Sequence, residues 1–339
     1  MPRPPITVKV SYGNDKTTPH LLRQSEQQSG TWKDHKFLIN QNVEECDWWV
    51  VCHASSLTKP ETTRCDPDHI IFISMEPSEP PEHSEFYNQF SQLVLVDEVI
   101  KHKSIKRFSA TTWWVGIKVE FNGSHQFSPE VTETYESLSN TPPGKKINRI
   151  SLICSAKDFL PGHKIRTDFI NKLKESPASQ HIDFFGAGSK PIPDKLDAIA
   201  PYKYHLAIEN TIANDYWTEK LSDSFLGYAM PIYAGCPNIS QYFPGNSLFS
   251  LDLTNTAAAI STINDVIRLD PYDSRLTSVV QARSKVLNDY NLLNIISQLC
   301  ERKSANIQTC TLRPRGDLNI QRLPLTKLKQ FARRIIRLL

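Results

Sequence analysis

The sequence predicts an α/β fold with two domains, each built around a parallel sheet. A chain of 339 residues is too long for one ordinary core and fits two domains of roughly 150 residues each. With 39% hydrophobic and only 22% charged residues, the composition is that of a folded globular chain. Short apolar runs alternate with helical patterns, which indicates parallel strands covered by helices on both faces.

Apolar or β-branched runs bounded by polar turns are expected to be strands. They fall at 6–13, 47–54, 70–77 and 93–100 in the first half, and at 149–156, 181–188, 204–211, 230–235 and 247–253 in the second. Helical periodicity predicts helices over 165–176, 218–230 and 255–269. A ligand is then expected between the two domains, outside the carboxyl ends of the strands.

The segment 121–146 is poor in apolar residues and rich in Ser, Thr, Pro and Gly, so it is expected to link the two halves. The predicted organisation is a first domain over 1–120, a linker over 121–147, a second domain over 148–312 and a basic tail over 313–339.

Several classes of protein are not supported by the sequence. The seven cysteines are scattered without a CxxC pair, which is typical of a reducing compartment and predicts neither a disulfide framework nor a zinc site. The ten histidines show no HxH or HExxH spacing, and the DPD at 66–68 precedes a strand and is interpreted as a turn, so no metal site is predicted. We expect neither a signal peptide nor a membrane span, because no run of about 18 apolar residues occurs.

The basic charge is concentrated in the tail. From Arg313 onward eight basic residues stand against one acidic residue, although the whole chain has a formal net charge of only +3. This concentration argues against a nucleic-acid binder, whose basic surface usually extends over the folded body. Residues 325–339 place apolar side chains on one helical face and basic ones on the rest, which predicts an amphipathic helix attracted to an anionic membrane surface. The alternative is a helix packed on its own domain.

Two segments in the second half combine apolar patterns with polar residues suited to a binding site. Glu209 and Asn210 directly follow a buried-strand pattern, where side chains enter the expected ligand site; the alternative is a polar pair that caps the next turn. Asp215 or Thr218 is expected to cap the helix that follows. Its buried face is expected to contain Leu221, Phe225 and Ala229.

The first turn of that helix contains Glu219 and Lys220. A carboxylate is favourable beside the positive end of the helix dipole, but a lysine there is not. Lys220 is better explained if an anion binds, because helix N-termini and lysines both attract phosphate. The pair therefore predicts a clamp for a diphosphate and for sugar hydroxyls.

The stretch YKYHLAIENTIANDYWTEKLSDSFLGYAMPIYAG (202–235) resembles the signature of the α-1,3/1,4-fucosyltransferase family (glycosyltransferase family 10), bacterial type. Weaker similarity extends over about 149–253. The resemblance implies a GT-B fold, with two Rossmann-like domains whose parallel sheets face a cleft, here followed by the C-terminal amphipathic helix. It also implies an inverting enzyme that uses GDP-fucose. Two cations and a helix terminus can stabilise a departing GDP without a metal, and no DxD-type motif follows a strand in the second half, so no cofactor is expected to be required. Whether a divalent ion assists turnover stays open.

The resemblance also implies roles for individual residues. Tyr216, Glu219 and Lys220 would contact the donor, with Lys220 neutralising phosphate and Glu219 accepting hydrogen bonds from hydroxyls. Glu209 and Asn210 would line the donor pocket. Arg166, in KIRTDFINKL, would be the second phosphate cation, since its planar fork suits bidentate contact. The alternative for Arg166 is a solvated charge on a helix face.

On the acceptor side, Glu76 in FISMEPSEPP is the candidate general base, at the carboxyl end of a predicted strand. The segment resembles a family motif in the N-terminal domain, but Pro77 departs from the usual residue order. Glu79 is the rival base, and either residue could be an ordinary loop charge. Trp113 and Trp114 either stack on an acceptor sugar or pack in a core.

These observations predict an inverting fucosyltransferase that moves L-fucose to a hydroxyl of a surface glycan, with O-3 of GlcNAc or Glc as the expected position. The alternatives are a GT-B enzyme with another nucleotide sugar and a non-catalytic module that binds a glycan or a nucleotide. By resemblance, the protein is expected to be cytoplasmic and peripheral on the inner face of a bacterial membrane. The acceptor glycan, the linkage position and the oligomeric state cannot be predicted from this sequence.

Overall fold

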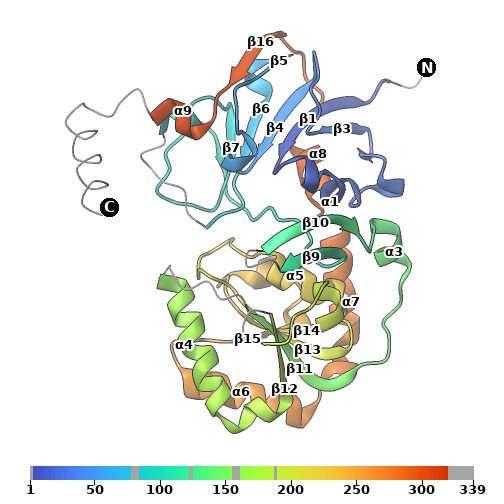
Figure 1. Ribbon diagram of the computed structural model, residues 1–339, viewed down its shortest axis with the longest axis vertical. Helices are drawn as coiled ribbons and strands as arrows, with labels where there is room; N and C mark the ends of the chain where they lie inside the picture. Colours follow the sequence, from blue (N-terminus) through green and yellow to red (C-terminus); the bar gives the residue numbers. More distant parts are fainter. Residues whose placement is uncertain (1–2, 78–83, 122–124, 155–160, 187–188, 320–339) are drawn as a thin grey trace, which may run out of the picture.

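The computed structural model describes residues 3–77, 84–121, 125–154, 161–186 and 189–319 and shows two α/β lobes (Figure 1). The hairpin of β9 (Ile117–Phe121) and β10 (His125–Val131) lies at the boundary between the lobes. Strand β10 lies within the predicted linker, which also contains α3 (Tyr135–Asn140), whereas β9 lies almost entirely before it. The low apolar content of the linker therefore does not prevent regular structure.

The strand order of the first sheet is β2 (Thr31–Trp32), β3 (His35–Ile39), β1 (Ile6–Tyr12), β4 (Trp48–Cys52), β6 (Ile70–Ile73), β7 (Gln92–Val94) and β8 (Ile105–Lys106). Four of these seven strands, β1, β4, β6 and β7, overlap the apolar runs predicted for the first half, whereas β2, β3 and β8 were not predicted. All neighbouring strands are parallel except β2 and β3. Every residue of β4 and β6 is buried, as expected for inner strands covered on both faces.

The second sheet is parallel throughout, in the order β12 (Ile182–Gly186), β11 (Ile147–Cys154), β13 (Tyr202–Ile208), β14 (Met230–Ala234) and β15 (Phe249–Ser250). Helices α4 (Pro161–Glu175), α5 (Glu219–Leu226), α6 (Thr256–Leu269) and α7 (Tyr272–Leu287) surround it (Figure 1). Each strand and helix predicted for this half is present, with α7 in addition, so these sequence predictions are confirmed.

In both sheets the first strand lies inside the sheet rather than at its edge. Strand β1 lies between β3 and β4, and β11 lies between β12 and β13. In each sheet, later strands of the chain are therefore added on both sides of the first strand. The place where the order of addition changes side is a topological switch point, where ligands of open α/β sheets bind. His53 directly follows β4, and Glu209 directly follows β13.

Near its end the chain returns to the first lobe. Buried side chains of α8 (Leu292–Leu299) pack in the same core as β1 and β4, and β16 (Gln308–Leu312) pairs antiparallel with β5 (Glu61–Cys65). The sequence predicted that the second domain extends to residue 312 and did not anticipate this return. The reason is that the apolar pattern of α8 requires burial but does not specify which lobe buries it.

The remaining described helices are short: α1 (Thr18–Leu22), α2 (Ser84–Tyr87) and α9 (Arg315–Asn319). The predicted amphipathic helix of the tail, residues 325–339, lies outside the described residues. Within the described part of the chain, no helix is both long and apolar enough to cross a membrane.

Candidate functional site

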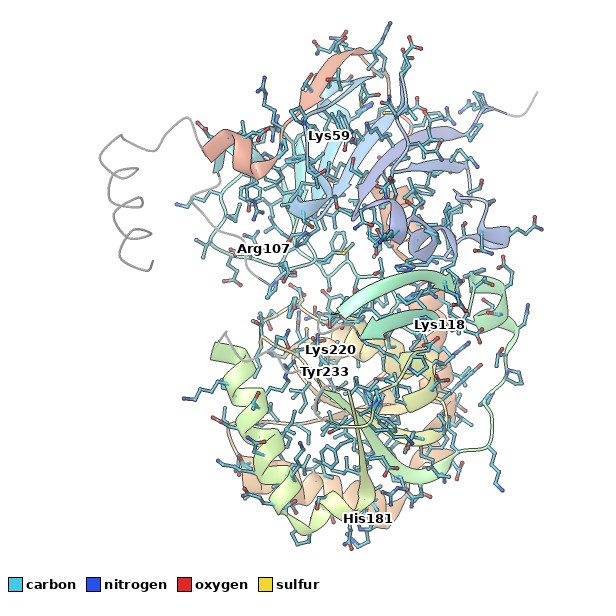
Figure 2. All side chains as sticks on the ribbon, in the orientation of Figure 1. Lys59, Arg107, Lys118, His181, Lys220 and Tyr233 are labelled. Atoms are coloured by element: carbon cyan, nitrogen blue, oxygen red, sulfur yellow. The ribbon has the colours of Figure 1, made fainter. Side chains whose placement is uncertain are left out.

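The carboxyl ends of the second sheet face the first lobe. Figure 2 shows Lys220 and Tyr233 at the end of the second lobe next to the first, whereas His181, which immediately precedes β12, lies at the far end. Parallel strands share one direction, so the residues that follow β13 and β14 are also presented toward the first lobe. Most of the predicted donor residues lie here.

Glu209 connects the end of β13 to the start of α5. Its backbone N–H donates to Ala234 O, and its carboxylate accepts from Thr218 N at 2.8 Å and from Thr218 Oγ1 at 2.7 Å. The residue is only 3% exposed. Burial raises the pKa of this carboxyl, while Lys220 and the bonds from Thr218 oppose the shift. Glu209 therefore fixes the residue at which α5 begins, as well as adding a carboxylate to the site.

Gly235 is needed beside Glu209 because there is no space for a larger residue. A β-carbon at position 235 would lie 2.3 Å from Tyr233 Oη and 2.5 Å from Glu209 Cγ. This close approach gives a physical reason for glycine at the end of the MPIYAG stretch.

Thr218 is the N-cap of α5, as one of the two predicted alternatives. Its Oγ1 accepts from Lys220 N at 3.3 Å. Asp215 has a different role: at φ 60° its carboxylate accepts from Asn238 Nδ2 and Tyr242 Oη, both at 2.7 Å. The predicted inner face of the helix is confirmed for Leu221 and Phe225, which are fully buried. Ala229 is also buried, but it lies beyond the end of α5 at Leu226.

The ammonium group of Lys220 lies among oxygen atoms at the first turn of α5. Its Nζ is 3.2 Å from Thr218 Oγ1, 3.5 Å from Glu219 Oε1 and 3.5 Å from Glu209 Oε2. Burial lowers the pKa of Lys220, but Glu219 and Glu209 outweigh it, so the net shift is upward. Lys220 is thus held in its charged form within the site.

Two residues that were not predicted extend this cluster: Lys195 and Asp223. Lys195 Nζ lies 3.4 Å from Glu219 Oε1 and 3.3 Å from Asp223 Oδ2. Burial raises the pKa of Glu219, yet Lys220 and Lys195 reverse this and lower it to about 2. Asp223 keeps a pKa raised to about 6, chiefly by burial. Glu219 is therefore fully ionised at neutral pH.

Arg166 on α4 reaches the same region. It is buried, with 7% exposure, and its Nη1 donates to Asn210 Oδ1. It is also close enough to Lys220 for like-charge repulsion to lower the pKa of the lysine. These contacts do not fit the alternative of a solvated helix charge, and they bring two cations together at one end of the second lobe.

Glu76 faces this cluster from the first lobe. It follows β6, and its Oε1 lies 3.4 Å from Nε2 of His53, a residue that sequence reasoning missed. The pKa of Glu76 is lowered, first by its hydrogen bond with His53 and also by Lys220. The effect of Lys220 shows that the carboxylate lies within electrostatic range of the second lobe. Glu79, the rival base, lies outside the described residues.

Tyr216 is buried between these groups, with 5% exposure. Burial raises the pKa of its hydroxyl, and Glu209, Glu219 and Glu76 add to the shift. Tyr216 therefore lies near carboxylates of both lobes and stays protonated, as a hydrogen-bond donor.

The two tryptophans have different surroundings. Trp113 is 1% exposed and belongs to the core of the second lobe, so packing, rather than sugar stacking, describes its place here. Trp114 is half-buried, its backbone N–H donates to Asp223 Oδ1 at 3.0 Å, and Lys195 Nζ lies 4.6 Å from its ring centroid. Its backbone and ring thus contact Asp223 and Lys195, and Lys195 in turn contacts Glu219.

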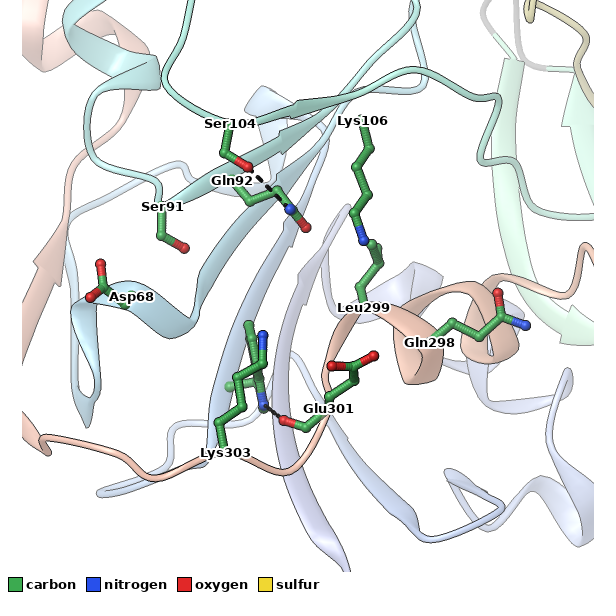
Figure 3. A pocket seen from close by; sticks show the side chains of 10 residues that line it. Asp68, Ser91, Gln92, Ser104, Lys106, Gln298, Leu299, Glu301 and Lys303 are labelled. Atoms are coloured by element: carbon green, nitrogen blue, oxygen red, sulfur yellow. Dashed lines mark hydrogen bonds between the residues drawn. The ribbon is translucent and has the colours of Figure 1, made fainter.

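A separate polar cavity of about 240 Å³ lies in the first lobe (Figure 3). It opens at the amino ends of β4, β6, β7 and β8, the edge opposite Glu76, and the segment after α8 closes one side. Its lining comprises Trp48, Asp68, Ser91, Gln92, Ser104, Lys106, Gln298, Leu299, Glu301 and Lys303. Two acidic residues, Asp68 and Glu301, balance the charge of the two lysines in this lining. The cavity shares no residue with the cluster around Lys220.

Across the described ranges, no group of three or more His, Cys, Asp or Glu side chains is arranged to hold a metal ion. The carboxylates of the cluster instead have lysine, threonine or histidine partners.

Comparison with known proteins finds a family model that matches part of the chain. Residues 146–272 match the family model described as glycosyltransferase family 10 (fucosyltransferase) C-term. The chain is 29% identical over 109 residues to alpha-(1,3)-fucosyltransferase B of Drosophila melanogaster and 36% identical over 88 residues to alpha-(1,3)-fucosyltransferase 4 of Bos taurus. These alignments cover 31% and 24% of this chain, but only 24% and 22% of the two relatives.

A likeness over most of the chain comes from a solved structure. The crystal structure of an alpha1,3-fucosyltransferase with GDP-fucose matches with a TM-score of 0.51 and 17% sequence identity, covering 90% of this chain and 93% of that one. At this identity the match concerns the fold. Together with the two parallel sheets, it confirms the predicted GT-B architecture.

Proposed function

We propose that this chain, whose residues 146–272 match the family model of glycosyltransferase family 10, transfers L-fucose from GDP-fucose to a glycan hydroxyl with inversion at the sugar carbon. The observation that carries the proposal is the pairing of Arg166 and Lys220 at the carboxyl end of the second sheet, opposite Glu76 of the first lobe. The two cations suit a diphosphate leaving group on one side of a reacting sugar. The carboxylate suits a proton acceptor on the other side.

Arg166 and Lys220 would hold the diphosphate of the donor. The guanidinium offers several N–H donors in a fixed plane, and the ammonium is a compact charge kept protonated by its carboxylate neighbours. Charge that develops on the departing GDP would meet cations already in place, which lowers the barrier without reorganisation of the site. On this basis the reaction needs no metal ion.

The acidic and aromatic residues would orient the sugar and the nucleotide. Glu219 is ionised and accepts hydrogen bonds, which suits fucose or ribose hydroxyls. Glu209 and Asn210 would act on the donor partly through Thr218 and Arg166, the residues they bind. Tyr216 can donate its hydroxyl proton to the donor.

Glu76 would be the general base. As the acceptor oxygen attacks the sugar carbon on the face opposite GDP, its proton passes to the Glu76 carboxylate, which gives inversion. Glu76 is an exposed side chain, as a group that must meet an acceptor should be. For the acceptor we propose O-3 of a GlcNAc or Glc unit in a surface glycan; this rests on the sequence resemblance alone.

A panel of nucleotide sugars tests the donor. The purified chain is incubated with each donor, with a mixed glycan acceptor pool, with and without EDTA, and release of the nucleoside diphosphate is measured. Turnover with GDP-fucose alone, unaffected by EDTA, is expected. Turnover with a different donor would refute the sugar while keeping the phosphate clamp. Binding of GDP without turnover from any donor would favour a non-catalytic binding module.

Arg166→Ala tests the clamp. Hydrogen bonds to charged groups contribute about 1.5–3 kcal/mol, so the Kd for GDP should rise roughly 10- to 100-fold in calorimetric titration. Arg166→Lys should recover only part of the affinity, because it loses the planar fork. Lys172→Ala, an exposed lysine on the same helix, is the matched control. Unchanged GDP affinity in Arg166→Ala and Lys220→Ala would contradict the assignment.

We also propose that residues 325–339 attach the enzyme to the inner, cytoplasmic face of a bacterial membrane. The support is the basic, amphipathic sequence of this segment. Cosedimentation with anionic vesicles should be lost on truncation at residue 324, and binding that survives the truncation would refute the proposal.

A further inference from the structure

His53 occupies a position in the first lobe that matches the position of Glu209 in the second. It is the first residue after β4, at the switch point between β1 and β4. Its backbone N–H donates to Ile73 O at 2.8 Å, which joins it to the end of β6, three residues before Glu76. The side chains of His53 and Glu76 therefore leave adjacent strands at the same edge of the sheet.

The hydrogen bonds of the ring determine which nitrogen carries the proton. Ser55 N, which can only donate, donates to Nδ1 of His53 at 3.2 Å, and Ser55 Oγ lies 2.7 Å from the same nitrogen. Nδ1 is thus the acceptor, and the proton of the neutral ring is on Nε2. Nε2 is the atom that lies 3.4 Å from Glu76 Oε1, so the imidazole donates to the carboxylate.

This arrangement assigns different roles to the two side chains. With Nδ1 accepting and Nε2 donating, the imidazole has no free lone pair with which to take a proton from an acceptor hydroxyl. Glu76 keeps its second oxygen, Oε2, for that purpose. The side chains of His53 and Glu76 remain 35% and 57% exposed, so a substrate can reach the pair.

We propose that His53 is a positioning residue for Glu76, an inference that rests on the proposed function. The Nε2–H of His53 fixes Oε1 and aims Oε2 at the acceptor. In the reaction the acceptor oxygen bonds to the sugar carbon, the bond from that carbon to the phosphate oxygen breaks, and GDP leaves with the electron pair. The acceptor proton goes to Oε2, and His53 keeps its own proton throughout.

The hydrogen bond also keeps Glu76 ionised beside other charges. The described titratable groups that act on Glu76 or feel its charge are His53 from its own lobe, and Lys220, Glu219 and Tyr216 from the second lobe. His53 and Lys220 lower the pKa of Glu76, and Glu219 raises it. Without His53, the pKa of Glu76 should rise. The carboxylate would then be protonated, and unable to act as a base, at pH values where it is ionised in the wild type.

The test compares pH profiles of kcat/KM for the wild type, His53→Ala and His53→Gln. In His53→Ala we expect kcat to fall roughly 10- to 100-fold with the KM for the donor unchanged, and the acidic limb to move to higher pH. His53→Gln keeps an N–H donor at a similar distance from the backbone. It should restore much of kcat and return the acidic limb most of the way to its wild-type pH. His102→Gln, a histidine of the same lobe bound to Ser104 O and Phe90 O, is the control.

A measurement without turnover separates this inference from the proposed function. In ¹⁵N NMR of the imidazole rings, His53 should show a protonated Nε2 whose signal shifts in Glu76→Gln. Two results would overturn the inference. One is turnover by His53→Ala with the acidic limb of its kcat/KM profile at the wild-type pH, and the other is a His53 ring protonated on Nδ1. If no variant turns over any donor but the NMR result holds, the contact stands and the proposed function fails.

Discussion

At the scale of single residues, the site depends on close packing around Glu209 and Gly235, where a larger side chain would not fit. Glu209 binds the residue that starts α5, and Gly235 lets the carboxylate approach the end of β14. A cation, a cap and a carboxylate are thereby held within one hydrogen-bonded group. Small changes of volume at this point are expected to disturb both stability and the donor site.

Gly235→Ala tests that close approach. The new methyl would collide with Tyr233 Oη and Glu209 Cγ, so the free energy of unfolding should fall by roughly 1–3 kcal/mol. GDP affinity should fall as well, because Glu209 holds Thr218. Gly245→Ala, where the same methyl would meet nothing within 4 Å, is the control. Equal stability of the two variants in denaturant titration would show that the contact around Gly235 relaxes freely.

Asp223 should make stability depend on pH. Its pKa is raised from 3.8 to about 6 in the folded protein, so the folded state binds the proton more tightly than the unfolded state does. The free energy of unfolding therefore increases as pH falls through about 6. Between pH 8 and pH 5 this increase is on the order of 1 kcal/mol. Asp223→Asn should remove this slope in urea titrations, whereas Asp289→Asn, an exposed carboxylate, should keep it.

The same pH slope in wild type and Asp223→Asn would contradict the assignment. Glu219 acts in the opposite sense: its pKa is lowered to about 2, so its contribution is present above its unfolded pKa and is lost as pH falls toward 2. The two effects separate because the Glu219 loss occurs below the window used for Asp223.

At the scale of elements, local patterns explain what was predictable. The buried runs of β13 and β14 and the inner face of α5 are visible as apolar spacing, and the sequence also contains the signal that Glu209 and Glu76 follow strands. The same rule applied to the run 47–54 would have singled out His53. Lys195 and Asp223 carry no such signal, because their partners come together only through tertiary packing.

The return of α8 was not predictable, since an apolar helix can be buried by either lobe. Ile296→Ala should lower the free energy of unfolding by about 2–5 kcal/mol, because the side chain is fully buried against the first sheet. Amide exchange should quicken in β1 and β4. Leu269→Ala, 63% exposed, should change stability by no more than about 0.5 kcal/mol. Faster exchange confined to β13 and β14 would contradict the described packing.

At the scale of the whole molecule, the proposed function requires both lobes. The second lobe contains the two cations and the stretch that matches the family model, whereas the first supplies Glu76 and His53. The sequence predicted the strands of the second sheet but only β1, β4, β6 and β7 of the first. Most of the candidate donor residues could be named because they lie in one continuous stretch. The sequence could not predict which groups of the first lobe would face them, since that depends on how the two sheets pack against each other.

Glu76→Gln tests most directly whether a base on one lobe acts on a donor held by the other. The measurement is GDP release from GDP-fucose with a glycan acceptor pool, alongside calorimetric binding of GDP. We expect turnover by the wild type, and in the variant unchanged GDP affinity with turnover lowered by roughly 10²- to 10⁴-fold. Turnover by Glu76→Gln at the wild-type rate would contradict it.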